Sequence, residues 1–120
     1  MKRTKKPPLG LVASERQIQQ AVIEYLTLME RRFRCYFVRV GSGAIKTDDG
    51  RYFKSGKRGC PDVLLCLGGR FYGLEIKTAT GGRQSDPQKD AQQMIEHNGG
   101  KYLVVRSAEE VMELFTSEKR

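Results

Sequence analysis

Histidine and cysteine are scarce in this sequence. It contains one histidine, His97, and three cysteines, Cys35, Cys60 and Cys66. Cys60 and Cys66 lack the ligand spacing of a zinc site. His97, near the end of an expected helix, is interpreted as a partner of the helix dipole. No base is therefore evident for a serine or cysteine catalytic triad, and the sequence argues against both zinc and triad chemistry.

Long apolar runs are absent as well. No stretch approaches the roughly 18 consecutive apolar residues that a membrane-spanning helix needs. The basic residues 1–8 are not followed by the apolar core of a secretion signal, so export is not expected. Without export, the cysteines are interpreted as reduced thiols. We expect a cytoplasmic protein, associated with the nucleoid or, if a phage encodes it, located in the host cytoplasm.

Acidic residues are in the minority. Lys and Arg number 22 against 14 Asp and Glu, which gives a formal net charge of +8. An excess of this size favours polyanionic partners, because each neutralised phosphate releases a condensed counterion. Charge alone does not separate a nucleic-acid-binding protein from a soluble protein that is merely basic.

The chain has the length of one domain. Its 120 residues are 38% hydrophobic, which is enough for one compact core. We divide it into a basic flexible N-terminal arm over 1–12, a single domain over 13–116 and a charged C-terminal tail over 117–120.

Hydrophobic periodicity predicts the element order α-β-β-β-β-β-α-β-α. The first helix begins with a capping box, Ser14 to Gln17, and carries an apolar stripe at helical spacing. The stripe consists of Ile18, Ala21, Val22, Tyr25, Leu26 and Met29. Five strands follow, and Asp49-Gly50 is the turn of a hairpin that need not join the main sheet. The strands are predicted over 35–40, 44–47, 51–54, 62–67 and 70–77.

Two further helices enclose a last strand. We place the N-cap of the second helix at Asp86, with Pro87 at its first position. Its expected core residues are Ala91, Met94 and Ile95. A capping box from Ser107 to Glu110 begins the last helix. Because a helix separates the strands 70–77 and 101–106, we expect them to run parallel in a mixed sheet.

The turn at Gly68-Gly69 predicts that two carboxylates face each other. In a two-residue hairpin, each step back along one strand matches a step forward along the other. Counting from the pair Leu67 and Arg70, the same register brings Asp62 opposite Glu75. Directly opposed residues have Cβ atoms about 4.5–5.5 Å apart. Lys77 lies two residues beyond Glu75 and so emerges on the same face.

Two carboxylates at this spacing repel each other, and a cation must compensate. Mg²⁺ binds one or two carboxylates and keeps several waters. The alternative is an ordinary ion-pair cluster in which Lys77 alone neutralises Asp62 and Glu75. We favour the metal site, because charges at the end of two apolar strands are costly to bury without a purpose.

These residues resemble a known nuclease motif. Asp62 followed by Glu75-Ile76-Lys77 is similar to the PD-(D/E)xK signature, and Pro61 supplies its leading proline. Gly59-Cys60-Pro61-Asp62 resembles the Gly-x-Pro-Asp block of the virus-type replication-repair nuclease (VRR-NUC) family. That family also has an early helix with a glutamate, matched by Glu15, and a Ser-x-x-Gln helix start, matched by Ser85 to Gln88. The resemblance covers about Ser14 to Phe115.

The resemblance implies an α/β fold with a restriction-endonuclease-like core, a mixed sheet flanked by helices. It implies that Asp62, Glu75 and the backbone carbonyl of Ile76 hold Mg²⁺ or Mn²⁺. Lys77 would orient or activate the attacking water, or stabilise charge on the phosphate. Glu15 would complete the metal shell or position a water, unless it only stabilises the helix dipole. Gln88 would bind the site water or Lys77.

DNA contacts are expected from a basic loop that leads into Asp62, namely Lys54, Lys57 and Arg58. Further candidates are Arg83, Ser42 and Gly43. Such contacts would fix the position of the DNA backbone without reading its sequence. A solvated basic loop without a partner remains the alternative.

We therefore predict a Mg²⁺- or Mn²⁺-dependent, structure-specific DNA endonuclease. The resemblance implies a homodimer that resolves four-way (Holliday) junctions in repair, recombination or phage replication, since two sites related by a twofold axis suit the symmetry of a junction. One alternative is a flap or overhang nuclease with the same chemistry. The other is a non-catalytic nucleic-acid-binding module on the same fold.

Overall fold

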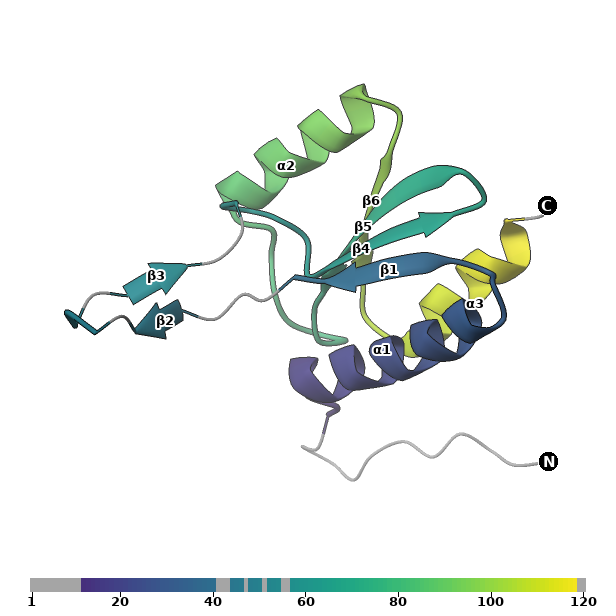
Figure 1. Cartoon of the computed structure of the whole chain (residues 1–120), viewed down its shortest axis with the longest axis horizontal. Helices are drawn as coiled ribbons and strands as arrows, with labels where there is room; N and C mark the ends of the chain where they lie inside the picture. The colour runs from purple at the N-terminus through teal and green to yellow at the C-terminus, as the bar shows by residue number, and fades with distance from the viewer. Residues whose placement is uncertain (1–11, 41–43, 47, 51, 55–56, 119–120) are drawn as a thin grey trace.

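The computed structural model describes residues 12–40, 44–46, 48–50, 52–54 and 57–118, and its elements follow the predicted order (Figure 1). The elements are α1 (Glu15–Arg31), β1 (Tyr36–Arg39), β2 (Ala44–Lys46), β3 (Tyr52–Lys54), β4 (Val63–Leu67), β5 (Arg70–Ile76), α2 (Asp86–His97), β6 (Lys101–Val105) and α3 (Ala108–Ser117). No helix among the described residues is both long and apolar enough to cross a membrane.

The main sheet has four strands in the order β1-β4-β5-β6. β1 and β5 pair with β4 in antiparallel fashion, and β6 runs parallel to β5, so the sheet is mixed as predicted. The β4–β5 hairpin has the predicted register, from Leu67 opposite Arg70 to Val63 opposite Leu74. β2 and β3 form a separate hairpin that projects from the body (Figure 1).

The core lies on one face of this sheet. α1 and α3 cover that face together, whereas α2 lies on the opposite face (Figure 1). Alternate residues of the strands point into the core and meet the apolar sides of α1 and α3. The buried members are Ile18, Val22, Leu26, Met29, Val63, Leu65, Leu67, Tyr72, Leu74, Ile76, Val105, Val111 and Phe115. Ala21, which was predicted to belong to the core, is exposed because it lies at the side of the buried stripe.

The opposite face is covered less completely. None of the residues of α2 is buried, and Met94, a predicted core residue, is 70% exposed. Ala91 and Ile95 are half-buried, and Ile95 packs beside Gly73 of β5. A pocket of about 470 Å³ lies between α2 and the sheet. Because Glu75 alternates with the core residues Leu74 and Ile76, its side chain points to this α2 face.

The helix starts differ in part from the prediction. α1 has the predicted box: Ser14 Oγ accepts from Gln17 N at 3.1 Å, and Gln17 Oε1 accepts from Ser14 N at 2.8 Å. The N-cap of α2 is Ser85 and not Asp86, because only this choice puts Gln88 at the third helical position, where it completes a second box.

The predicted capping box of α3 does not form. Ser107 occupies the N-cap position, but its side chain makes no capping hydrogen bond. Glu110 Oε1 instead accepts from the backbone N–H of Arg106 at 2.8 Å. The acidic side chain of the first turn therefore satisfies a donor that lies just before the N-cap.

Gly59 fixes the distance between α2 and the segment that enters β4. Its φ is +76°, and a Cβ atom there would overlap the backbone carbonyl of Pro87. Gly99 also has a positive φ, +91°, but has open space around it.

We expect Gly99→Ala to lower the free energy of unfolding by about 1 kcal/mol, the cost of the left-handed backbone alone. Gly59→Ala should cost about 3 kcal/mol or more, since it also forces backbone apart. Urea denaturation of both variants checks this, and equal losses would contradict the role of Gly59.

Candidate active site

Two carboxylates and a lysine meet where β4 begins and β5 ends. Asp62 immediately precedes β4, and its Oδ2 accepts a hydrogen bond from the backbone N–H of Ile76 at 2.7 Å. Glu75 and Ile76 are the last residues of β5, and Lys77 follows them. The hairpin register thus brings Asp62 and Glu75 to the same end of the sheet.

Glu75 is the buried acid of this group, with 6% of its surface exposed. Its Oε2 accepts a hydrogen bond from Gln88 Nε2 at 2.8 Å and lies 3.8 Å from Lys77 Nζ. Its Oε1 is buried and accepts no hydrogen bond from a protein donor among the described residues, while a hydrogen bond between Glu75 and Asp62 requires that one of the two acids keep a proton. Since buried carboxylate oxygens are normally satisfied, this atom calls for a ligand.

Burial makes both carboxylates hard to ionise, and the charge of Asp62 adds to this effect at Glu75. Burial, followed by the charge of Asp62, raises the pKa of Glu75 to about 7, against the opposing effect of Lys77. Burial also raises the pKa of Asp62, although the N–H of Ile76 and the charge of Lys77 oppose this. One lysine therefore does not fully compensate the pair, and a further cation would lower both pKa values.

The donor set fits a hard divalent cation. The backbone N–H of Lys77 donates to Val105 O, so the backbone of Glu75 and Lys77 faces β6. The N–H and carbonyl of Ile76 then face the opposite side, where Asp62 accepts. Two carboxylates and one carbonyl match the few protein oxygens that Mg²⁺ takes while it keeps waters. The described part of the chain has no group of three or more His, Cys, Asp or Glu side chains that would form a closed metal cage.

The two other acid-site candidates occupy different positions. Glu15 is exposed in the first turn of α1, where its charge contributes to the raised pKa of Glu75. It does not join the two acids as a third member of a metal-binding group, so its role as a ligand stays a prediction. Gln88 was predicted to bind a water or Lys77, but its amide donates directly to Glu75.

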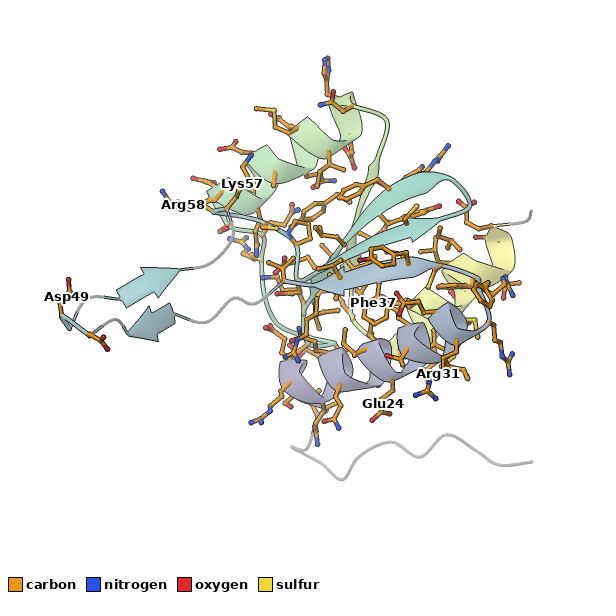
Figure 2. The ribbon with its side chains drawn as sticks, in the orientation of Figure 1. Glu24, Arg31, Phe37, Asp49, Lys57 and Arg58 are labelled. Carbon is orange, nitrogen blue, oxygen red and sulfur yellow. The ribbon has the colours of Figure 1, made fainter. Side chains whose placement is uncertain are left out.

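The residues predicted to contact DNA are only partly described. Lys57 and Arg58 are exposed, and Figure 2 shows them beside the N-terminal end of α2. Arg83 is exposed in the segment between β5 and α2. Lys54 is the last residue of β3, of which the backbone is described, and 42–43 (Ser42 and Gly43) lie outside the described residues.

Sequence reasoning missed Tyr102. It is buried on the α2 face, and its hydroxyl lies near Gln84, which opposes the rise of its pKa. Burial, followed by the charge of Glu75, raises its pKa to about 12. The phenol therefore stays protonated beside the carboxylates. No sequence signal pointed to it, because its position depends on the parallel pairing of β5 with β6.

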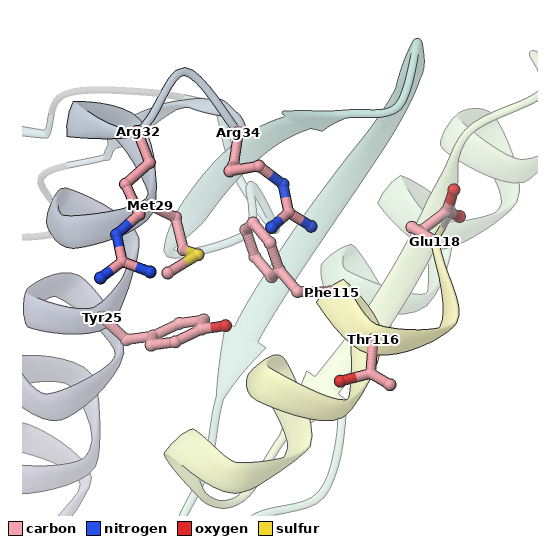
Figure 3. Close-up of a pocket in the computed structure, with 7 residues that line it drawn as sticks. All are labelled: Tyr25, Met29, Arg32, Arg34, Phe115, Thr116 and Glu118. Carbon is pink, nitrogen blue, oxygen red and sulfur yellow. The ribbon is translucent and has the colours of Figure 1, made fainter. Parts of the chain in front are cut away.

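A larger pocket lies at the other end of α1 and is unrelated to these acids. It measures about 630 Å³ and lies between the ends of α1 and α3 (Figure 3). The rings of Tyr25 and Phe115 pack there edge to face, with their centroids 5.3 Å apart. The guanidinium carbon of Arg34 lies 6.0 Å from the centroid of the Phe115 ring. These aromatic contacts hold the two helices together.

One solved structure supports the fold class. A structure described as a "VRR_NUC domain" is similar to this chain with a TM-score of 0.58 and 18% sequence identity, covering 89% of this chain and 100% of that chain. The chain has the fold of a VRR_NUC domain. The predicted α/β class, a mixed sheet flanked by helices, is thus confirmed. No family model and no curated protein matches the sequence.

In this VRR_NUC fold, Gln88 connects the start of α2 to the buried acid. We expect Gln88→Ala to lose about 1 kcal/mol of stability through its capping box and to weaken Mn²⁺ binding about 10–100-fold, since Glu75 is no longer oriented. Gln17→Ala is the matched control, because it removes the equivalent capping box of α1. Denaturation and isothermal titration with Mn²⁺ measure the two effects. Equal Mn²⁺ affinity in both variants would contradict a role of Gln88 at the site.

The raised pKa of Glu75 predicts an inverse dependence of stability on pH. Because the folded pKa of about 7 exceeds the ordinary value near 4.5, the folded protein binds the extra proton in this interval. Without metal, its stability should fall as pH rises from about 4.5 to 7. Glu75→Gln removes the charge and should gain stability over the parent across this window, by on the order of 1–3 kcal/mol above pH 7. Chemical denaturation in chelator at several pH values measures it, and parallel curves for the two proteins would refute it.

Proposed function

We propose that this protein is a divalent-metal-dependent endonuclease that hydrolyses phosphodiester bonds in DNA. One observation carries the proposal: the buried, unpartnered Oε1 of Glu75 beside Asp62, at the end of the sheet where Lys77 also lies. A purely structural ion-pair cluster would be expected to satisfy that oxygen, since an unsatisfied buried acceptor is costly.

Each residue has a distinct task in this reaction. Asp62, Glu75 and the carbonyl of Ile76 would hold Mg²⁺ or Mn²⁺, which when bound lowers the pKa of a coordinated water and offsets negative charge on the phosphate. Gln88 keeps the carboxylate of Glu75 in one orientation through its 2.8 Å hydrogen bond. Lys77 would orient the attacking water or stabilise the charge that develops on the phosphate. The water loses a proton as it adds to phosphorus, the P–O bond to one sugar breaks, and the sugar oxygen that leaves takes up a proton, so that a phosphomonoester end and a hydroxyl end result.

The surface around the site suits a DNA backbone. Lys57 and Arg58 are exposed in the segment that leads to Pro61 and Asp62. Arg83 lies in the segment that follows Lys77. Contacts from both segments would hold the strand on either side of the scissile bond. Glu15 would position a water at the edge of the site.

We propose a four-way junction as substrate and a homodimer as the active form. The α2 face leaves apolar side chains of β1 and β5 uncovered: Tyr36 is 65% exposed, and Val38 and Phe71 are also exposed. β1 is one of the two edge strands of the main sheet, and the outward N–H of Phe37 is already engaged by Glu30 Oε2 at 3.2 Å, so the second copy would pack on these apolar side chains. Two sites related by a twofold axis would cut a junction symmetrically. The setting would be the cytoplasm, in repair, recombination or phage replication.

The first experiment is cleavage of an end-labelled four-way junction beside matched linear duplex, flap and single-stranded DNA. It is run with Mg²⁺, with Mn²⁺ and with chelator. We expect paired symmetric cuts in the junction that disappear with chelator. Asp62→Ala and Glu75→Ala should lower the rate at least about 1,000-fold while DNA binding is retained, since they remove the metal ligands.

The control substitutes an exposed acid away from the site, Glu24→Ala, and should cut at the parent rate. Cuts in flaps or overhangs in place of the junction would keep the chemistry and replace the substrate. Unchanged cleavage by Glu75→Ala would refute the assignment. Tight DNA binding without any cleavage would favour the non-catalytic module.

A further inference from the structure

A second hollow beside the candidate site is markedly cationic. It measures about 520 Å³ and opens next to Lys77, between the segment after β5, the start of α2 and the end of β6. Its lining residues are Lys77, Gly82, Arg83, Gln84, Lys89, Val104 and Arg106. Four of the seven are Lys or Arg, and none is acidic. We call this hollow the basic pocket.

The wall of the basic pocket is built by Arg106. Its guanidinium donates to the carbonyls of Thr78 and Gly81, each at 2.6 Å, and of Gly82 at 3.3 Å. The backbone N–H of Gly81 also donates to Thr78 Oγ1 at 2.9 Å. These bonds hold the segment 78–82 in one shape. Arg106 is therefore a structural cation whose donors are largely engaged.

Glycine at position 82 brings this segment against Lys77. Gly82 has a φ of +80°, and a Cβ there would lie 2.6 Å from Cδ of Lys77. At the other side, Gln84 Nε2 donates to Gln92 Oε1 of α2 at 2.8 Å. The segment that carries Arg83 is thus fastened at both ends. These contacts hold the backbone of the pocket wall in place.

Only one of the four cations of the basic pocket is paired with an acid among the described residues. Lys77 is paired with Glu75 at 3.8 Å. Within the described ranges, no carboxylate forms an ion pair with Arg83, Lys89 or Arg106. Like charges held close together destabilise one another unless an anion joins them. The pocket therefore selects for a small, multiply hydrogen-bonding anion, and a phosphate group satisfies this requirement.

We propose that the basic pocket binds a backbone phosphate of the DNA strand, next to the phosphate that is cut. This inference rests on the proposed function. Lys77 borders both the pocket and the carboxylate site, so one strand that passes Lys77 reaches both with consecutive phosphates. Arg83 and Lys89, both exposed, are the binding residues. The pocket thus adds Lys89 as a DNA-binding residue. It also adds Arg106 as the residue that positions the segment carrying Arg83.

The first test measures binding without cleavage. Affinity of the Arg83→Ala/Lys89→Ala protein for fluorescent DNA is determined by anisotropy in chelator, at several salt concentrations. Each lost phosphate contact should reduce the slope of log K against log salt by about 1. Because the pocket is proposed to hold one phosphate, we expect a slope reduced by about 1 and an affinity about 10–100-fold lower at 0.1 M salt.

The matched control removes the same two charges at the opposite end of the sheet. Arg70→Ala/Lys101→Ala changes the first residues of β5 and β6, which are exposed and remote from Lys77. We expect less than about a threefold effect on affinity, as for charges outside a contact site. Equal losses of DNA affinity in both double variants would show a general effect of protein charge and would overturn the proposal. Unchanged affinity in both would overturn it as well.

The second test locates the phosphate. One methylphosphonate, which is neutral, replaces a single phosphate at successive positions of the DNA strand. We expect one position to weaken binding of the parent protein and to have no further effect on the Arg83→Ala/Lys89→Ala protein, because the two changes remove the same contact. Additive losses at every position would overturn the proposal.

Failure of the phosphate-binding proposal can be distinguished from failure of the proposed nuclease function. Both tests are run in chelator, so they report binding even if the protein cleaves nothing. A subsite found by the methylphosphonate scan together with absent cleavage would refute the nuclease and keep the subsite. Metal-dependent cleavage together with unchanged salt slopes would support the nuclease and refute the phosphate subsite.

Discussion

The carboxylate of Glu75 is held out of water at the end of β5, and the arrangement around it follows from that constraint. A buried charge needs either a partner or a proton. Gln88 supplies a hydrogen bond, Lys77 supplies an incomplete ion pair, and Asp62 adds repulsion. The pKa of Glu75, raised to about 7, reflects this incomplete compensation of its negative charge. A bound cation would remove it, which links affinity for metal to the burial of this one side chain.

The two faces of the sheet differ in how completely the helices bury them. α1 and α3 bury the core face, where strand residues such as Leu65 and Leu74 are almost fully enclosed. α2 contributes no buried residue and leaves pockets on its side. Stability is thus concentrated on one face, and the other can present charged and polar groups. This division explains how an uncompensated acid pair is tolerated in a small domain.

Much of the site could be read from the sequence because its logic is local. The hairpin at Gly68-Gly69 fixes which residues of β4 and β5 are neighbours, so the approach of Asp62 to Glu75 followed from counting residues. Alternation placed Lys77 on the same face. The capping box of α1 was equally local. Met94 was wrongly placed in the core because a short amphipathic pattern does not specify how α2 packs on the sheet. Asp86 was wrongly taken as the N-cap although the deciding signal, the capping box from Ser85 to Gln88, is local.

The sequence by itself determined the order of elements, the β4–β5 register and the chemical character of Asp62, Glu75 and Lys77, because these depend on residues near one another along the chain. Only the tertiary structure decided that Gln88 binds Glu75, that Tyr102 lies buried beside the acids and that Arg106 braces the segment after Lys77. Each of these contacts crosses from β5 or its exit to α2 or β6. The parallel pairing of β5 with β6 sets them, and no turn fixes its register along the sequence.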